Sequence, residues 1–123
     1  MIRLCKTTMH GTSMLGLYRG LKLKTAGTPW RVEVVTGDID TLRSACADGP
    51  LILSVGLPRC GAADTRFETD WGWQRGRKHA VVLFGFTGDG RVEMGDPSVG
   101  REHWREEGIR VLYRRQALRL VRQ

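Results

Sequence analysis

The sequence predicts an α+β fold, with N-terminal helices packed on a largely antiparallel β-sheet, in a single domain spanning residues 1–123. The expected segments follow the order helix, strand, helix, strand, long loop, hairpin, helix, strand, which is typical of this class. Two of the strands are joined through Asp89-Gly90, a strong hairpin signal. No linker or repeat divides the chain, and its 41% hydrophobic and 27% charged residues are ordinary for one globular core.

Helical segments are expected at the beginning of the chain. Residues 1–7 form a short helical tail in this interpretation, and Thr12 or Ser13 can cap the helix that follows. That helix should end within residues 25–27, because glycine and then proline stop it. Its apolar positions recur at helical spacing: Met14, Leu17, Tyr18 and Leu21.

Two strands are expected on either side of a second helix. Residues 30–35 (WRVEVV) are rich in β-branched and aromatic types, and residues 51–57 (LILSVGL) form an apolar run after Gly49-Pro50. Between them, Asp38 or Asp40 can cap the helix. Its inner face carries Leu42, Ala45 and Cys46.

The second half of the chain begins with a long segment, residues 58–78, that has no clear periodicity. A loop of this length in a compact domain is usually a functional cover or a disordered insert. The hairpin strands 79–87 and 91–95 follow, and residues 102–111 are expected to hold one more helix. The alternating segment ALRLV, residues 117–121, predicts the last strand.

The composition limits the classes of partner. A net charge of +7 and a pI near 10 would suit nucleic acid or an anionic membrane surface. The arginines are spread along the chain, however, and those near its end belong to no nucleic-acid-binding motif. We therefore favour a solvated basic face over a nucleic-acid partner.

Targeting and ligand signals are sparse. The apolar runs have strand length, too short to cross a bilayer, and the first residues have neither the apolar region nor the cleavage site of a secretory signal. Three cysteines at unrelated spacings define no disulfide framework, which favours a reducing compartment such as the cytoplasm. We expect no metal site, because no Cys-x-x-Cys pair exists and the histidines are scattered, and no ATP site, because no phosphate-binding loop is present.

His79 and Asp96 are the residues with the clearest catalytic potential. His79 begins an apolar strand, and Asp96 ends the strand that returns from the hairpin, so both side chains are expected at the same sheet edge. In a catalytic triad a histidine is the general base, and a carboxylate fixes its tautomer and orientation. On spacing alone the structural alternative is the more common one, since Asp-Pro is also a frequent turn initiator.

The motifs around these residues carry a family resemblance. HAVVLFGF from His79 and GDPSVGREHW around Asp96 resemble the histidine and aspartate signatures of the double-glycine leader peptidases that process bacteriocins, a papain-like cysteine peptidase family. The N-terminal segment MIRLCKTTMHGTSMLGLYRGLKLKT and GPLILSVGL are similar to that family's helices and to the strand before its histidine strand. The resemblance implies a papain-like fold, with His79 as general base and Asp96 as the residue that orients it.

The same resemblance implies that the nucleophile lies elsewhere. In the family it belongs to a Cys-Gly that begins the first long helix, after a glutamine, and this helix precedes the one that residues 1–7 resemble. We therefore expect an N-terminally truncated peptidase domain that is inactive alone. Loss of that helix should also bare apolar surface on the helix from Met14 to Leu21 and on neighbouring strands, giving a marginal or self-associating fold.

Other residues offer weaker site interpretations. Cys60 lies in a loop beside Arg59, where positive charge favours the thiolate, so it is a substitute nucleophile, with Cys5 behind it. Neither is predicted to begin a helix, and structural roles remain open for both. Trp71 and Trp73 in the long loop can contact a peptide substrate or anchor the loop to the core.

Two functions stay open at this point. The first is a cysteine peptidase that needs no cofactor, with a peptide or protein as its substrate. The second is a peptide- or substrate-binding module of the same fold that has lost its cysteine. Retention of both His79 and Asp96 favours truncation over degeneration, and any association with a membrane or a transporter depends on sequence outside these residues.

Overall fold

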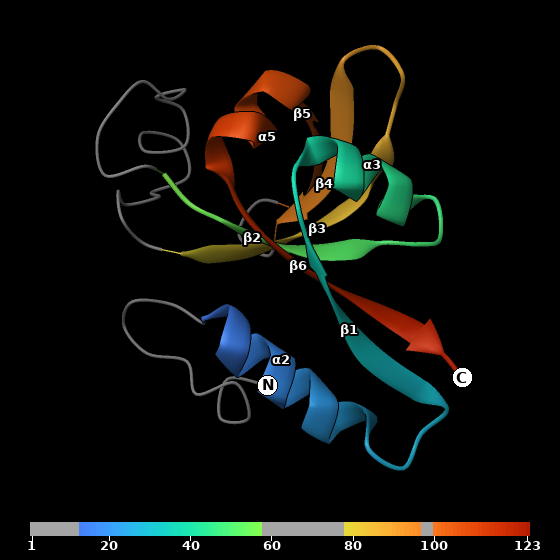
Figure 1. Cartoon of the computed structure of the whole chain (residues 1–123). Helices are drawn as coiled ribbons and strands as arrows, with labels where there is room; N and C mark the ends of the chain where they lie inside the picture. Colours follow the sequence, from blue (N-terminus) through green and yellow to red (C-terminus); the bar gives the residue numbers. More distant parts are fainter. Residues whose placement is uncertain (1–12, 58–77, 97–99) are drawn as a thin grey trace.

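An antiparallel sheet of six strands lies at the centre of the computed structural model, which describes residues 13–57, 78–96 and 100–123. The strand order is β1-β6-β2-β3-β4-β5. Helix α2 lies on one face of this sheet, and helices α3 and α5 lie on the other (Figure 1). The strands are β1 (Trp30–Thr36), β2 (Leu51–Val55), β3 (His79–Phe86), β4 (Arg91–Asp96), β5 (Gly100–Arg105) and β6 (Tyr113–Arg122); the helices are α2 (Met14–Thr25), α3 (Ile39–Cys46) and α5 (Glu106–Leu112).

Alternating side chains give the sheet two apolar faces. In β6, Ala117 packs toward α3 and α5, whereas the next residue, Leu118, packs toward α2. In β1, Val35 packs toward α3 and α5, and Val32 packs toward α2. Successive residues of a strand point to opposite faces, so both faces can be covered by helices only because both carry apolar residues.

Capping side chains begin the two N-terminal helices of the described region. Ser13 Oγ accepts a hydrogen bond from the backbone N–H of Gly16 at 3.0 Å, and α2 then ends at Thr25, as expected. Asp38 Oδ1 accepts from the backbone N–H of Thr41 at 3.1 Å and begins α3. This bond is the main reason that the pKa of Asp38 lies below its ordinary value. Each bond satisfies a backbone donor that has no partner inside its helix.

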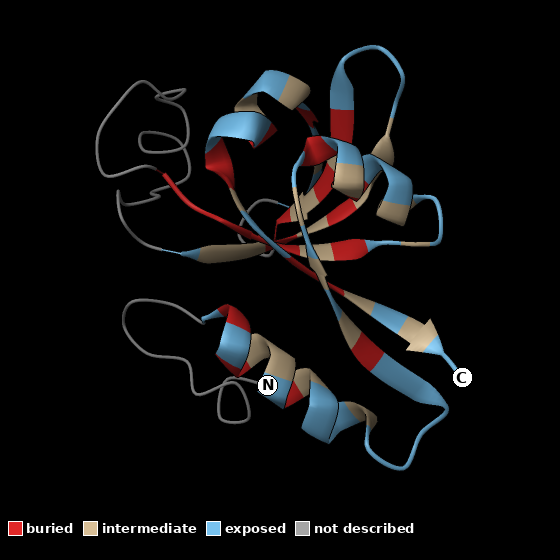
Figure 2. Cartoon of the chain, in the orientation of Figure 1, coloured by how far each residue is buried: buried red, intermediate tan, exposed pale blue. Residues whose placement is uncertain are grey.

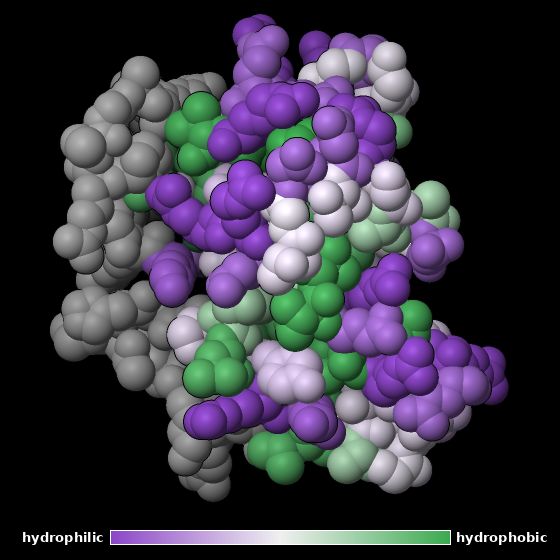
Figure 3. Space-filling model, viewed as in Figure 1, coloured by the Kyte–Doolittle hydropathy of each residue, from purple (hydrophilic) through white to green (hydrophobic). Residues whose placement is uncertain are grey.

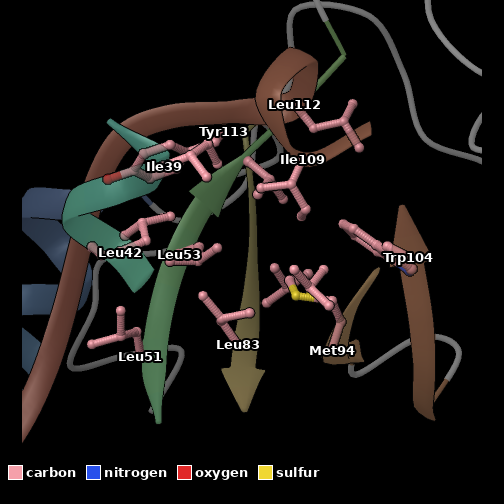
Figure 4. Packing of buried hydrophobic residues seen from close by; sticks show 14 of the residues in the cluster. Ile39, Leu42, Leu51, Leu53, Leu83, Met94, Trp104, Ile109, Leu112 and Tyr113 are labelled. Atoms are coloured by element: carbon pink, nitrogen blue, oxygen red, sulfur yellow. The ribbon is translucent and has the colours of Figure 1, made fainter. Parts of the chain in front are cut away.

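The larger core lies between the sheet and the helices α3 and α5. Leu53 and Leu83 of the central strands face Ile109 of α5, and Leu42 of α3 closes one side (Figure 4). Buried residues concentrate on the strands, while the outer sides of the helices are exposed (Figure 2). Trp104 of β5 is 1% exposed and extends this core to the far edge of the sheet.

The expected helix over residues 102–111 is wrong in its first half. Residues 100–105 form β5 instead, and α5 begins only at Glu106. The reason is pairing with β4: Trp104 lies opposite Val92 and enters the core, while His103 points outward. This two-residue alternation is what β-pairing requires, and it prevails over helical propensity.

Two other expectations shift at their boundaries. The strand within residues 51–57 ends at Val55, and the last strand begins at Tyr113 rather than at residue 117. The early start of β6 contains an irregularity, since its pairing with β2 shifts register between Leu53 and Val55, and Arg115 has a positive φ of 63°. The tail at residues 1–7 and nearly all of the loop at 58–78 lie outside the described residues.

The apolar side of α2 contacts the sheet. Met14 is buried, and Leu17 and Leu21 are half-buried against β1, β2 and β6. On the outer side of the helix, Leu15 and Leu23 are exposed, and hydrophobic patches are visible at the bottom of the surface in Figure 3. None of the described helices is long and apolar enough to cross a membrane.

Candidate active site

The β3–β4 hairpin brings His79 and Asp96 together. His79 is the first residue of β3 and Asp96 the last residue of β4. In the register of the pair, Val82 lies opposite Gly95, which places Asp96 and His79 on the same face near the open end of the hairpin. The imidazole Nε2 lies 3.0 Å from the carboxylate Oδ1.

Burial differs sharply between the two side chains. The Asp96 side chain is fully buried, whereas 30% of the His79 side chain is exposed. A carboxylate shielded from water interacts strongly with a nearby imidazole, because little solvent screens the attraction. The imidazole, in turn, remains within reach of a molecule arriving from solution.

The geometry also determines the roles of the two ring nitrogens. A carboxylate can only accept, so in neutral His79 the proton sits on Nε2 and is donated to Asp96. Nδ1 then carries the lone pair that accepts a proton. The serine-protease triad divides the roles the other way, with Nδ1 facing the aspartate. The pair can therefore act as a base and its orienting group through Nδ1.

Tight packing supports the aspartate from the α2 face of the sheet. A Cβ on Gly95 would come within 2.9 Å of the Phe84 ring, so only glycine lets this ring lie across β4. The Arg101 guanidinium stacks on the outer side of the same ring, 4.2 Å from its centroid. Gly95, which directly precedes Asp96 on β4, therefore packs against a ring from β3 that Arg101 of β5 covers.

Tyr113 is a buried polar residue that the sequence did not single out. It lies opposite Val55 on β2, and Val55 lies opposite His79 on β3. Its hydroxyl is buried and has no hydrogen-bond partner among the described residues, and burial raises its pKa to about 12. No motif distinguishes it, since a tyrosine that begins a strand is an ordinary core residue.

Cys46 does not lie at the candidate site. It is half-buried on α3, its Sγ contacts the backbone oxygen of Leu83 at 3.8 Å, and burial raises its pKa. Leu83 is four residues along β3 from His79, which corresponds to about 13 Å of strand. The other predicted candidates, Cys5, Cys60, Trp71 and Trp73, lie outside the described residues. Within the described ranges, no cluster of His, Cys, Asp or Glu could hold a metal ion.

Several solved structures share this fold. The peptidase domain of Streptococcus ComA, a bi-functional ABC transporter of a quorum-sensing pathway, matches with a TM-score of 0.68 and 22% identity over 99% of this chain and 75% of its own. A double-glycine motif protease from an AMS/PCAT transporter, solved with its leader peptide, matches with a TM-score of 0.66 and 16% identity over 98% and 68%. The chain has the fold of these peptidase domains.

This similarity confirms the papain-like α+β fold with its largely antiparallel sheet. The fold also occurs beyond these peptidases. A periplasmic domain of the Vibrio vulnificus EpsAB fusion protein, from a type II secretion system, matches with a TM-score of 0.55 and 14% identity over 84% of this chain and 38% of its own. No protein-family model matches the sequence, and neither does any curated protein.

Proposed function

We propose that the chain is a cysteine peptidase-like domain in which His79 is the general base and Asp96 orients it. The observation that carries this proposal is the 3.0 Å contact between His79 Nε2 and the buried Asp96 carboxylate, at the open end of a hairpin in this fold. The reaction is hydrolysis of a peptide bond, and the residues require no cofactor for it.

The chemistry follows from the two ring nitrogens of His79. Nδ1 takes the proton of a cysteine thiol, and the thiolate attacks the scissile carbonyl. The imidazolium then returns the proton to the leaving amine as the C–N bond breaks, leaving an acyl-enzyme that water hydrolyses. Asp96 holds Nε2–H throughout and stabilises the imidazolium by its negative charge.

The nucleophile in this proposal is a cysteine at the start of a helix, outside the described residues. Cys46 does not serve, because its thiol contacts Leu83 and its raised pKa disfavours the thiolate. We therefore propose that the 123 residues alone do not hydrolyse peptides, since a base and its orienter have nothing to activate.

The proposed substrate is a leader peptide that ends in a double glycine. The support comes from the neighbours: one is a double-glycine motif protease in complex with a leader peptide, and a ComA peptidase domain of Streptococcus mutans has been solved with a small-molecule inhibitor. Association with a transporter would require sequence outside these 123 residues.

A thiol-reactive probe tests the proposed inactivity. We expect no cysteine of the isolated chain to react faster than an ordinary exposed thiol, and no difference between wild type and His79→Ala. Stoichiometric labelling of Cys60 or Cys5 that is lost with His79→Ala would contradict it. A second check is the reading frame upstream of Met1, which we expect to encode a Cys-Gly preceded by glutamine.

A peptide-binding module is the second candidate. It is favoured by the position of Cys46 away from His79 and by the occurrence of the fold in the EpsAB periplasmic domain. It predicts that the 123 residues bind a double-glycine leader peptide without turnover, in a calorimetric titration. Binding in wild type and His79→Ala alike, together with an upstream frame that lacks Cys-Gly, would favour the module over the peptidase.

A further inference from the structure

Strand β1 forms an edge of the sheet and pairs only with β6 among the described strands. Its seven residues, WRVEVVT, contain no proline, glycine or lysine, and its register with β6 runs without a bulge. The opposite edge strand, β5, has the sequence GREHWR, in which half of the residues are charged. Edge strands are normally protected against further pairing by charges, prolines or bulges, and β1 lacks the last two.

The backbone groups that point out from this edge can be identified. Gln123 donates its N–H to the Pro29 oxygen at 2.7 Å, at the end of the β1–β6 ladder. Hydrogen-bonding direction alternates along an antiparallel strand, so Arg31 and Glu33 also bond toward β6. The N–H and C=O groups of Val32 and Val34 and the C=O of Trp30 therefore point to the open side, whereas the Trp30 N–H already donates to Thr28 Oγ1 at 3.2 Å.

The side chains along the edge form one apolar and one charged row. On the α2 face, Trp30 is 44% exposed and Val34 54% exposed, with the buried Val32 between them. On the other face, the Arg31 guanidinium binds the Glu33 carboxylate at 3.0 Å. Glu33 also binds Arg119 of β6, whose second partner is Asp48 at 3.8 Å.

We propose that β1 pairs with β1 of a second copy of this chain, antiparallel and centred on Val32. The two sheets then form one continuous sheet across a two-fold axis. Trp30 of each copy lies opposite Val34 of the other, and Arg31 lies opposite Glu33. The N–H and C=O of Val32 pair with those of Val32 in the other copy, and the Val34 N–H of each copy pairs with the Trp30 C=O of the other.

The charges select this register over its neighbours. A shift of the pairing by two residues in one direction places Glu33 opposite Glu33, and a shift in the other direction places Arg31 opposite Arg31. Like charges directly opposite each other are destabilising, whereas opposite charges in these positions attract. A shift by one residue is excluded because the outward backbone groups would no longer match.

The interface is small and leaves the candidate active site open. A short strand pair buries less than a standard protein interface of about 1,600 Å², so the affinity should be modest, in the micromolar range or weaker. His79 lies on β3, three strands from β1, which corresponds to about 14 Å across the sheet. The dimer is therefore independent of the proposed peptidase chemistry.

The test is the mass of the 123-residue chain in sedimentation equilibrium up to several hundred micromolar. We expect a monomer–dimer equilibrium in the wild type. Arg31→Glu places four carboxylates at the centre of the dimer, and Glu33→Arg places four guanidiniums there. The dissociation constant of each variant alone should therefore be about tenfold higher than that of the wild type, or more. An equimolar mixture of the two variants should dimerise again, because opposite charges then face each other.

A backbone variant and a surface control complete the test. Val34→Pro removes an outward N–H without removing a bond to β6 and should abolish the dimer, whereas Leu15→Gln removes an exposed apolar side chain of α2 and should leave it unchanged. Thermal unfolding checks that every variant is folded. A monomeric wild type, a dimer that survives Val34→Pro, or a mixture that stays monomeric would each overturn the proposal. Binding of an extended peptide to β1 by a monomeric chain would do so too, by assigning the edge to another partner.

Discussion

The contact between His79 and Asp96 determines what the candidate site can do. Asp96 has a fully buried side chain at the end of β4, so its carboxylate is held in place and shielded from water. By binding Nε2 it selects the ring nitrogen that accepts a proton. A histidine on a strand is common, but a histidine oriented by a buried carboxylate and still accessible to solvent has the features of a general base.

The tautomer of His79 is the first prediction at this scale. In the neutral wild-type imidazole we expect the proton on Nε2, measured by nitrogen NMR of histidine-labelled protein and assigned with His79→Gln. Asp96→Ala should redistribute the proton between the two nitrogens. Asp96→Asn should largely keep it on Nε2, since an amide oxygen can accept the same bond. A wild-type imidazole protonated mainly on Nδ1 would contradict the geometry.

Tyr113 gives a second residue-scale prediction, which concerns stability against pH. Its folded-state pKa of about 12 exceeds its ordinary value of 10.0, so the folded chain keeps a proton that the unfolded chain loses. The contribution of Tyr113 to the free energy of unfolding should therefore be fully present below pH 10 and fall as the pH rises toward 12. Chemical denaturation of Tyr113→Phe should show a smaller fall over this range.

The same variant has an expected effect at neutral pH. The Tyr113 hydroxyl is buried without a partner among the described residues, so its removal should stabilise the fold by about 1 kcal/mol. A Tyr113→Phe variant that is clearly less stable at neutral pH would show that the hydroxyl has a partner.

At the scale of elements, the hairpin is the part of the site that the sequence predicts best. Asp89-Gly90 marks its turn, and Gly88 and Gly90 adopt φ angles of 85° and 83°, which glycine accommodates without strain. Strand β5 could not be predicted in the same way. Half of the residues from Gly100 to Arg105 are charged, and the segment becomes a strand because β4 offers a partner and the core accepts Trp104.

The packing of Gly95 predicts a contrast between two glycines of this hairpin. Gly95→Ala places a Cβ against the Phe84 ring and should lower the free energy of unfolding by about 1–3 kcal/mol. Gly85→Ala is the matched control, because a Cβ on Gly85 meets nothing within 4 Å, so its effect should be much smaller. Denaturant titration of both variants measures the difference, and equal losses would show that the Phe84 contact is unimportant.

At the scale of the whole molecule, the sequence predicts the fold class and the order of most elements. Periodicity and capping residues locate α2 and α3, and a run of β-branched and aromatic residues locates β1, because these signals lie in the local sequence. The order of strands in the sheet could not be read in this way. It depends on long-range pairing, such as β6 between β1 and β2, for which neighbouring residues carry no signal.

The candidate site, too, could be predicted only in part from the sequence. The proximity of His79 and Asp96 could be predicted because both belong to one hairpin, whereas their catalytic interpretation came from the family resemblance. The distance of Cys46 from His79 required the structure, since it depends on how α3 packs across β3. The catalytic roles of His79 and Asp96 remain a proposal that the fold supports.

Cleavage of a double-glycine leader peptide tests the central proposal most directly. The enzyme should be the product of the whole open reading frame that contains these residues, with the isolated 123-residue chain as an inactive control. We predict cleavage after the double glycine and a fall in kcat of about 100-fold or more with His79→Ala, because the general base is lost. A folded wild-type product that cleaves no leader, or one that cleaves equally well with His79→Ala, would contradict the proposal.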